Sequence, residues 1–285
     1  MRSRRGLLES NELADAAGVR ISPAEFEQFR RLIHETAGIA LQPTKHALVA
    51  GRLASRLRAR GMTTFAQYRR LLDQPEEASE LQQAIDLLTT NETYFFREPQ
   101  HFEILADHAA RARASGRAYR VLSAAASSGE EAYSIAMTLA EVQGQLPWEV
   151  VGLDVSTRVI ARAIAGRYPF ERTKLIPEPY LKKYCLRGVG TQVGMLQVDP
   201  ALRRRVAFQH ANLTHPPPKI GRFDVIFLRN VLIYFDAPTK QRVVENLLDL
   251  LAPDGRFFTG HSESLSGVTS RVVAMKPAVY RLAGR

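Results

Sequence analysis

The fold is decided by residues 119–154, YRVLSAAASSGEEAYSIAMTLAEVQGQLPWEVVGLD. The apolar segment 119–122 predicts a short strand, and the small residues of 123–129 predict a tight loop whose backbone a ligand can approach closely. Residues 130–142 place apolar side chains at helical spacing, and 148–155 form a second apolar run that contains Asp154 near its end. This order of strand, loop, helix and strand predicts a βαβ nucleotide-binding unit.

The loop and the acidic residue after it indicate the kind of ligand. In βαβ units that bind dinucleotides, an acidic residue about 20 positions beyond a glycine-rich loop binds the ribose hydroxyls. Here Asp154 stands 25 residues after Gly129, and the loop holds one glycine instead of three. The pattern favours a nucleoside-like ligand without a pyrophosphate, so S-adenosylmethionine fits it better than NAD. A βαβ unit that binds no ligand is the alternative.

The composition is that of a globular protein with a strong excess of basic residues. The chain has 285 residues, of which 45% are hydrophobic, and a formal charge of +10. Such a charge calls for a negatively charged partner, which could be nucleic acid, an anionic membrane or an acidic protein surface. Cys185 is the single cysteine, which excludes an intrachain disulfide and thiolate metal clusters and fits a reducing cytoplasm.

The first part of the chain is predicted to be helical. Residues 1–20 lack the apolar stretch of a secretion signal, and we expect a flexible leader there. Residues 21–89 are expected to form a bundle of about four helices, the first of which starts at Ser22, with Glu25 completing a capping box. The second helix is expected from about Pro43 to Arg60.

This second helix has an unusual charge pattern. Between Lys45 and Leu72 there are seven Lys or Arg residues and no Asp or Glu. Arg52, Arg56 and Arg60 recur every four residues and therefore share one face. The pattern allows either a solvated helix face or a docking surface for an acidic partner, because like charges at this spacing repel one another.

A linker at residues 90–100 joins the helical part to the rest of the chain and contains the sequence NETYFFREP (91–99). Phe95 and Phe96 are expected to pack at the junction. Arg97 beside them is a candidate cation for a partly dry cleft, where a guanidinium binds an anionic group most strongly.

Residues 101–285 predict an α/β domain with about seven strands, mostly parallel and doubly wound by helices. Strands are expected at 206–213, 223–228, 256–259 and, at the edge, 272–282, with a helix at 238–251 and a turn at 253–255. The glycine-rich stretch 185–206 is expected to form a small β-insertion. Ligands of such sheets bind at the carboxyl ends of the strands, where the sequence puts the loop 123–131 and four further residues: Asp154, Asn212, Arg229 and Asn230.

Several of these segments resemble the successive motifs of one family, the CheR-type chemotaxis receptor methyltransferases. They are NETYFFRE, SAAASSGEEAYSIAM, the strand that ends at Asp154, FDVIFLRNVLIYFD and PDGRFFTGHSES, and the resemblance extends from about Ala24 to Leu282. It implies a helical N-terminal domain beside a Rossmann-like class I methyltransferase domain with an inserted β-subdomain. It also implies methyl transfer from S-adenosylmethionine, which becomes S-adenosylhomocysteine, to glutamate side chains of chemoreceptors.

The resemblance assigns roles to individual residues. Arg97 and Tyr234 correspond to catalytic residues beside the substrate carboxylate and the reacting methyl, and Asp154 corresponds to the ribose-binding acid. The other positions implied to bind the cofactor are Asn91, Thr93, Arg97, Glu131, Asn212, Leu213, Arg229 and Asn230. This chain has SSGEEA where the family usually has STGEEP, and the alanine still allows a helix to start there.

The chemistry of this reaction agrees with the residues that the chain lacks. The methyl on a sulfonium is already activated, and a glutamate is already ionised at pH 7. No general base, nucleophilic triad or metal is needed, and catalysis consists of positioning. The histidines are scattered without ligand spacing, so we expect no metal site; His261 is the one to watch, since it follows the fifth parallel strand.

The expected partner is the acidic helical cytoplasmic domain of a chemoreceptor, contacted by the basic face of the second helix. The insertion residues Arg187, Gly188 and Gly190 are candidates for binding a receptor's C-terminal peptide. We expect a cytoplasmic monomer that binds no nucleic acid and does not insert into membranes. Two alternatives stay open: RNA methylation, against which the lack of an N/D-P-P-Y-type motif counts, and a non-catalytic signalling module that binds S-adenosylmethionine.

Overall fold

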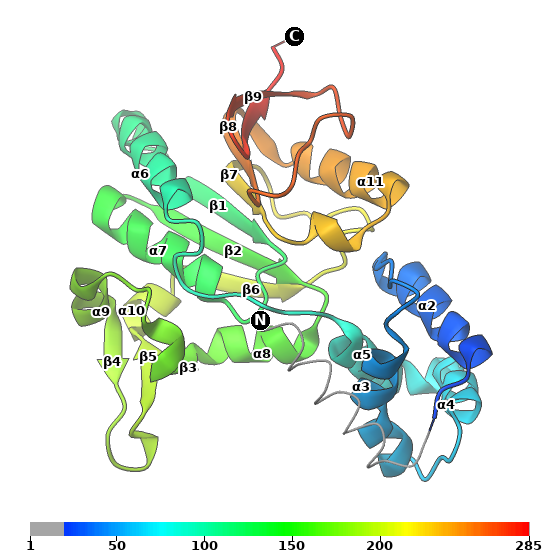
Figure 1. Cartoon of the computed structure of the whole chain (residues 1–285). Helices are drawn as coiled ribbons and strands as arrows, with labels where there is room; N and C mark the ends of the chain where they lie inside the picture. The colour runs from blue at the N-terminus through cyan, green and yellow to red at the C-terminus, as the bar shows by residue number, and fades with distance from the viewer. Residues whose placement is uncertain (1–19, 285) are drawn as a thin grey trace. The chain divides into compact units, whose positions relative to one another are not determined.

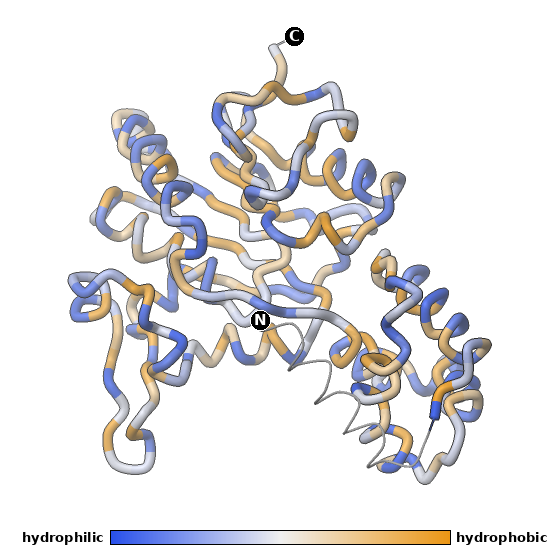
Figure 2. Tube along the Cα trace, viewed as in Figure 1, coloured by the Kyte–Doolittle hydropathy of each residue, from blue (hydrophilic) through white to orange (hydrophobic). Residues whose placement is uncertain are grey.

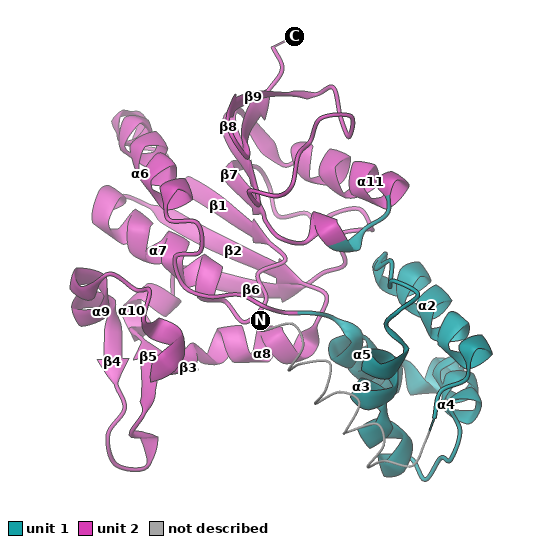
Figure 3. Ribbon diagram, viewed as in Figure 1, with its two compact units in different colours: residues 1–90, 234–236 teal, residues 91–233, 237–285 magenta. Residues whose placement is uncertain are grey.

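The computed structural model describes residues 20–284, which form two compact units (Figure 3). The helical unit holds residues 20–90 together with Tyr234–Asp236, and the α/β unit holds Asn91–Ile233 and residues 237–284. All of the predicted leader except Arg20 lies outside the described residues. No described helix is long and apolar enough to cross a membrane.

In the described part of the chain, the helical unit is built from four α-helices (Figure 1). They are α2 (Pro23–Ala37), α3 (His46–Ala59), α4 (Phe65–Leu72) and α5 (Ala78–Leu88), the last preceded by the 3-10 turn η1 (Pro75–Glu77). The predicted capping box is confirmed, since the Glu25 N–H donates to Ser22 Oγ at 3.2 Å and the Ser22 N–H donates to Glu25 Oε2 at 2.9 Å. The second helix begins at His46 and not at Pro43, because residues 43–44 form a turn.

The arginines of the predicted basic face have partners inside the helical unit. Arg56 donates two hydrogen bonds to the buried Glu80 carboxylate, at 2.8 and 2.5 Å. Arg60 pairs with Glu77 and lies 3.8 Å from Glu80, and Arg52 Nη1 donates to the carbonyl of the last residue of α5 at 2.9 Å. Residues of η1 and α5 therefore supply the counter-charges that α3 lacks. The arginines of this face are therefore neutralised within the unit, and their mutual repulsion is no reason to expect an external partner. Docking of an acidic partner at this face stays a prediction.

The α/β unit is built on a seven-stranded sheet with the order β6-β2-β1-β7-β8-β10-β9 (Figure 1). The first five strands in this order are mutually parallel, and β10 pairs antiparallel with both β8 and β9. The predicted fold class is therefore confirmed. The strands are β1 (Tyr119–Ala124), β2 (Trp148–Asp154), β6 (Val206–His210), β7 (Phe223–Leu228), β8 (Leu251–Thr259), β9 (Val272–Lys276) and β10 (Val279–Leu282).

Helices cover this sheet. Helix α7 lies on β1 and β2, α8 on β2 and β6, and α11 on β8. Figure 2 shows hydrophobic and hydrophilic residues alternating along α6 and α8, as expected for helices with one buried face. The bounds are α6 (Gln100–Ala112), followed by η2 (Arg113–Ser115), α7 (Glu130–Gln143), α8 (Thr157–Ala165) and α11 (Ala237–Leu248).

Several predicted boundaries in this unit are wrong. Strand β6 ends at His210, so Asn212 and Leu213 lie in the turn after it. Strand β8 starts before the predicted turn at 253–255, which lies inside the strand where its register against β7 shifts. The segment 272–282 forms two strands, of which β9 lies at the edge of the sheet as predicted. Pro277 lies in the turn between β9 and β10, because proline has no N–H to donate to the ladder.

A separate three-stranded antiparallel sheet, the small sheet, stands between α8 and β6 in the chain. Its order is β3-β5-β4, with β3 (Arg167–Pro169), β4 (Cys185–Arg187) and β5 (Met195–Val198). The predicted insertion at 185–206 is too short, because β3 joins the sheet from the segment directly after α8. The accompanying helices are η3 (Phe170–Thr173), α9 (Glu178–Tyr184), η4 (Gly190–Gln192) and α10 (Pro200–Arg203).

The topology of the large sheet determines where a ligand can bind. From β1 the chain moves outward through β2 to β6, and it then returns to the other side of β1 to form β7 and β8. The strand order therefore reverses between β1 and β7. In open α/β sheets, ligands bind at the carboxyl ends of the strands beside such a reversal.

Candidate functional site

The loop between β1 and α7 reaches this edge of the sheet and is packed tightly from behind. Ser127 and Gly129 have positive φ angles of 50° and 94°. A Cβ atom at Gly129 would lie 2.9 Å from Ala163 Cβ and 3.0 Å from the Tyr168 hydroxyl oxygen. Both the conformation and the close approach therefore require glycine at this position.

Asp154, the last residue of β2, is buried and bonded to this loop. Its Oδ2 accepts the Ser127 N–H at 2.8 Å, and its Oδ1 accepts the Ser156 N–H at 2.9 Å. A carboxylate oxygen can accept two hydrogen bonds, so this fixed carboxylate suits the paired hydroxyls of a ribose. Its place at the carboxyl end of the strand is confirmed, and its ribose-binding role stays a prediction.

The segment 91–98 folds against the same loop. Ser127 Oγ donates to the Asn91 carbonyl at 3.0 Å, and the Phe96 N–H donates to Ser134 Oγ at 3.0 Å. Phe95 and Phe96 are both part of the hydrophobic core of the α/β unit. These contacts bring the NETYFFRE motif beside the loop that follows β1.

Arg97 lies between two residues in the left-handed region, Phe96 at φ 53° and Glu98 at φ 57°. Such angles cost energy for side chains other than glycine, so the backbone here is held by its surroundings. Arg97 Nη1 donates to the Glu92 carbonyl at 3.3 Å, and the guanidinium lies 5.4 Å from the centroid of the Tyr94 ring. Among the residues described, no carboxylate forms an ion pair with Arg97, so its charge is available to an anionic ligand.

Arg229 is the centre of a buried network that joins three segments. Its side chain is 1% exposed. Nη1 donates to Glu131 Oε2 at 3.0 Å, and Nη2 donates to Glu98 Oε2 at 2.9 Å and to the Arg97 carbonyl at 2.6 Å. Glu131 Oε1 accepts from the Ser123 hydroxyl at 2.7 Å. Arg229 thus ties β7 to α7 and to segment 91–98, and a direct contact with the cofactor stays a prediction.

The two carboxyl groups of this network titrate differently. Burial pushes the pKa of Glu98 upward, but the hydrogen bond and charge of Arg229 outweigh it, and the pKa is lowered. Burial raises the pKa of Glu131 against the opposing charge of Arg229. Arg229 therefore stabilises the ionised form of Glu98 more effectively than that of Glu131, whose ionised form burial disfavours.

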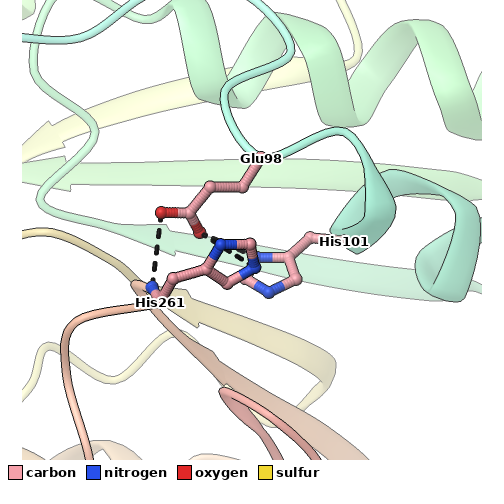
Figure 4. Close-up of side chains that lie close together, drawn as sticks. All are labelled: Glu98, His101 and His261. Atoms are coloured by element: carbon pink, nitrogen blue, oxygen red, sulfur yellow. Dashed lines mark hydrogen bonds and ion pairs between the residues drawn. The ribbon is translucent and has the colours of Figure 1, made fainter.

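Glu98 also lies close to two histidines (Figure 4). Its Oε2 is 3.4 Å from His101 Nδ1 and 4.0 Å from His261 Nε2, and its Oε1 accepts the His261 N–H at 3.3 Å. Burial, together with the charge of Arg229, lowers the pKa of His101 to about 4, so its imidazole is neutral. Sequence spacing does not predict this cluster. Carboxylate and imidazole are metal ligands, but Arg229 already bonds Glu98 Oε2 and its charge opposes a cation there.

Glu263 is a site residue that the sequence patterns do not single out. It is buried, and its Oε2 accepts the N–H groups of Asn230 at 2.6 Å and Gly260 at 2.8 Å, while Oε1 accepts the Ile233 N–H at 3.3 Å. Asn230 has a φ of 57°. Glu263 therefore fixes the turn that follows β7. The available signal was an acidic residue four positions after the end of a parallel strand, in the segment GHSES.

The remaining predicted residues lie at two other turns. Asn212 Oδ1 accepts the Thr214 N–H at 3.0 Å, which shapes the turn that holds Leu213. Tyr234 ends the 3-10 helix η5 (Leu232–Tyr234) and groups with the helical unit, where its carbonyl accepts the Ala40 N–H at 2.7 Å. The contacts predicted for Asn212 and Leu213 with the cofactor, and for Tyr234 with the reacting methyl, stay predictions.

The α/β unit fits S-adenosylmethionine by the chemistry of its groups. Asp154 offers oriented acceptors to ribose hydroxyls. A dinucleotide would instead require a glycine-rich cradle for its pyrophosphate.

The chain is similar in sequence to known proteins. Residues 24–89 match the family model described as CheR methyltransferase, all-alpha domain, and residues 91–280 match the one described as CheR methyltransferase, SAM binding domain. The chain is 44% identical over 265 residues to the chemotaxis protein methyltransferase of Escherichia coli (strain K12), with 92% of each chain covered. It is 43% identical over 259 residues to chemotaxis protein methyltransferase 2 of Pseudomonas aeruginosa, covering 90% of this chain and 92% of that one. The chain therefore belongs to the CheR methyltransferase family, and its α/β unit is an S-adenosylmethionine-binding methyltransferase domain of class I.

Proposed function

We propose that this protein methylates glutamate side chains of chemoreceptors and so forms glutamate methyl esters. Its family and the names of its relatives support this proposal. The observation that carries it is the position of Arg97 beside the loop of residues 125–129, between β1 and α7, which we call the cofactor loop. Arg97 is a cation with a fixed backbone and has no carboxylate partner among the described residues. S-adenosylmethionine supplies an activated methyl group and leaves as S-adenosylhomocysteine. The protein therefore has to hold the substrate carboxylate in line with the methyl group.

Arg97 is proposed to hold the substrate carboxylate. Its carbonyl accepts Arg229 Nη2 at 2.6 Å, and both neighbouring residues have positive φ angles. A guanidinium presents a planar fork of donors that can bind a carboxylate through two hydrogen bonds. Because a glutamate is ionised at pH 7, no side chain has to remove a proton. Tyr234 is proposed to orient the carboxylate or the methyl group.

Receptor binding is proposed at the small sheet. Three apolar side chains at and beside β4 are exposed, Leu186 by 49%, Val189 by 79% and Val193 by 74%. Strand β4 pairs only with β5 among the described residues, so its second edge is a place where an extended peptide could add a strand. A receptor's C-terminal peptide with an apolar side chain would match this edge and its neighbours.

The other residues predicted for partner binding have structural roles in this region. A Cβ atom at Gly188 would lie 1.9 Å from the Gln192 carbonyl oxygen, and Gly190 has a φ of 57°. Both glycines therefore shape the hairpin, and Arg187 is the charged side chain that it offers to a partner. We further propose that the protein acts as a cytoplasmic monomer on receptor helices. Docking at α3 would use the parts of the Arg56 and Arg60 side chains that stay exposed although both residues pair with acids of the helical unit.

The test is transfer of labelled methyl from S-adenosylmethionine to receptor-bearing bacterial membranes, scored as methanol released by mild base from the receptor band. Carboxyl methyl esters release methanol under these conditions, whereas methylated amines and nucleobases do not. Arg97→Ala is expected to abolish transfer and to change S-adenosylhomocysteine binding much less. Arg242→Ala is the control, because Arg242 is an exposed arginine of α11. Full activity of Arg97→Ala would show that the role given to Arg97 is wrong.

A further inference from the structure

We infer that Arg172 is a positioning residue for the cofactor loop: from the small-sheet side, its guanidinium holds the buried Glu130 carboxylate and the Thr93 carbonyl together. Arg172 lies in η3, outside every motif that carried the family resemblance. The inference rests on the proposed function, because it concerns the same cofactor site. It adds that this site is fixed in part by the insertion and not only by the methyltransferase sheet.

Two contacts of one nitrogen carry the inference. Arg172 Nη2 lies 2.6 Å from Glu130 Oε1, and the same nitrogen donates to the Thr93 carbonyl at 2.8 Å. Glu130 is the first residue of α7, directly after the loop glycine, and Thr93 belongs to the NETYFFRE motif. Arg172 therefore joins the two segments that flank the predicted cofactor position.

Electrostatics explain why the contact to Glu130 matters. The Glu130 side chain is 0% exposed, whereas that of Arg172 is 41% exposed. Burial raises the pKa of Glu130, and the hydrogen bond from the Ser128 hydroxyl at 2.7 Å and the charge of Arg172 oppose this rise. Among the described residues, Arg172 is the cation that pairs with this carboxylate. Without it, a buried carboxylate at the loop would keep one hydroxyl partner and no counter-charge, which favours a shift of the loop.

The segment 167–173 also connects the loop to the small sheet. Strand β3 pairs with β5 over Arg167–Pro169, and the Phe170 N–H donates to the Gly194 carbonyl at 2.8 Å. From the same segment, the Tyr168 hydroxyl donates to the Ser128 carbonyl at 2.7 Å. The segment therefore touches the small sheet through its backbone and the cofactor loop through two side chains. A change in the small sheet has a direct physical route to the loop.

Binding of S-adenosylhomocysteine by calorimetry, which needs no receptor, tests this inference on the full chain. Arg172→Ala is expected to raise the Kd by about tenfold, the size of one lost charge-assisted hydrogen bond. Lys174→Ala is the matched control, because it removes the same charge from an exposed residue of the next turn, and its Kd is expected to stay within about twofold. Arg172→Lys keeps the charge and is expected to give an intermediate Kd.

Two further readouts separate positioning from a general loss of stability. In Arg172→Ala, the backbone amides of residues 126–129 are expected to exchange hydrogen faster, because the Ser127 N–H depends on its bond to Asp154. Glu130→Gln removes the buried charge, so adding Arg172→Ala to it is expected to change the Kd less than Arg172→Ala alone does. If Arg172→Ala does not fold, Arg172→Lys and Glu130→Gln carry the test.

An Arg172→Ala protein that binds like Lys174→Ala, or whose effect simply adds to that of Glu130→Gln, would overturn the inference. A wild-type protein that binds S-adenosylhomocysteine but methylates no receptor would instead refute the proposed function. The two failures are therefore distinguishable, since the first is a binding result and the second an activity result.

Discussion

Replacing Arg229 by methionine should destabilise the α/β unit more than any exposed substitution. The side chain is 1% exposed and donates to Glu98, to Glu131 and to the Arg97 carbonyl. Methionine fills a similar volume but leaves two carboxylates close together in a buried place without a cation. Removing one partner of a buried ion pair costs about 3–5 kcal/mol. Against a typical stability of about 5–15 kcal/mol, this is a large share.

Urea unfolding followed by tryptophan fluorescence would measure this loss, because Trp148 is the only tryptophan and lies buried in β2. The loss should shrink as the pH falls from 7 to about 5. Without the guanidinium, burial raises the pKa values of both carboxyls, so the folded variant takes up protons that the unfolded chain does not, and acid stabilises it. In the wild type, Glu98 has a lowered pKa, and its contribution is lost only below the unfolded value of about 4.3.

Arg242→Met is the matched control for this experiment, since it makes the same replacement at an exposed position. Its cost should stay within about 0.5 kcal/mol. A cost below about 1 kcal/mol for Arg229→Met, or one that does not change with pH, would refute the view that Arg229 holds the site together by neutralising the two carboxylates.

Three other outcomes are expected. Asp154→Ala should weaken S-adenosylhomocysteine binding in calorimetry by about 1.5–3 kcal/mol, the value of a hydrogen bond to a charged group, and unchanged affinity would contradict the ribose-binding role. Val189→Asp should weaken binding of a labelled receptor C-terminal peptide in fluorescence anisotropy by about fivefold or more, with S-adenosylhomocysteine binding unaltered; equal loss with a charge at an unrelated exposed site would count against the small sheet. Glu80 has its pKa lowered first by the hydrogen bond from Arg56, so it stabilises the helical unit above the unfolded pKa of about 4.3 and loses this effect as the pH falls through the lower folded value. Glu80→Gln should therefore flatten the acid side of the stability curve measured by circular dichroism, and an unchanged curve would exclude this pair as its cause.

Patterns that depend on local burial were predictable from the sequence. The run 223–228 reads as a buried parallel strand, and all its residues are buried in the centre of the sheet. Ser22 and Glu25 predict a helix start through contacts three residues apart, and that start is confirmed. In both cases the sequence neighbours of a residue are also the neighbours that decide its structure.

Features that depend on distant partners were not predictable in this way. Arg229 can be buried because it forms ion pairs with Glu98 and Glu131. These two residues stand 131 and 98 positions away in the sequence. The acids that neutralise Arg56 and Arg60 lie on a different helical segment, so the face of α3 looked uncompensated. Strand β3 is three residues long and contains a proline, and only its pairing with β5 makes it a strand.

The position of the single cysteine gives the small sheet a reporter of its own. Cys185 opens β4, and burial, reinforced by the nearby Asp199 carboxylate, raises the pKa of its thiol to about 12. The thiolate is the form of cysteine that attacks thiol reagents, so at neutral pH these reagents should modify this chain chiefly when β4 separates from β5. The labelling rate would therefore measure how often the small sheet opens, and no added probe or engineered cysteine is needed. A peptide that pairs with β4 should lower this labelling rate.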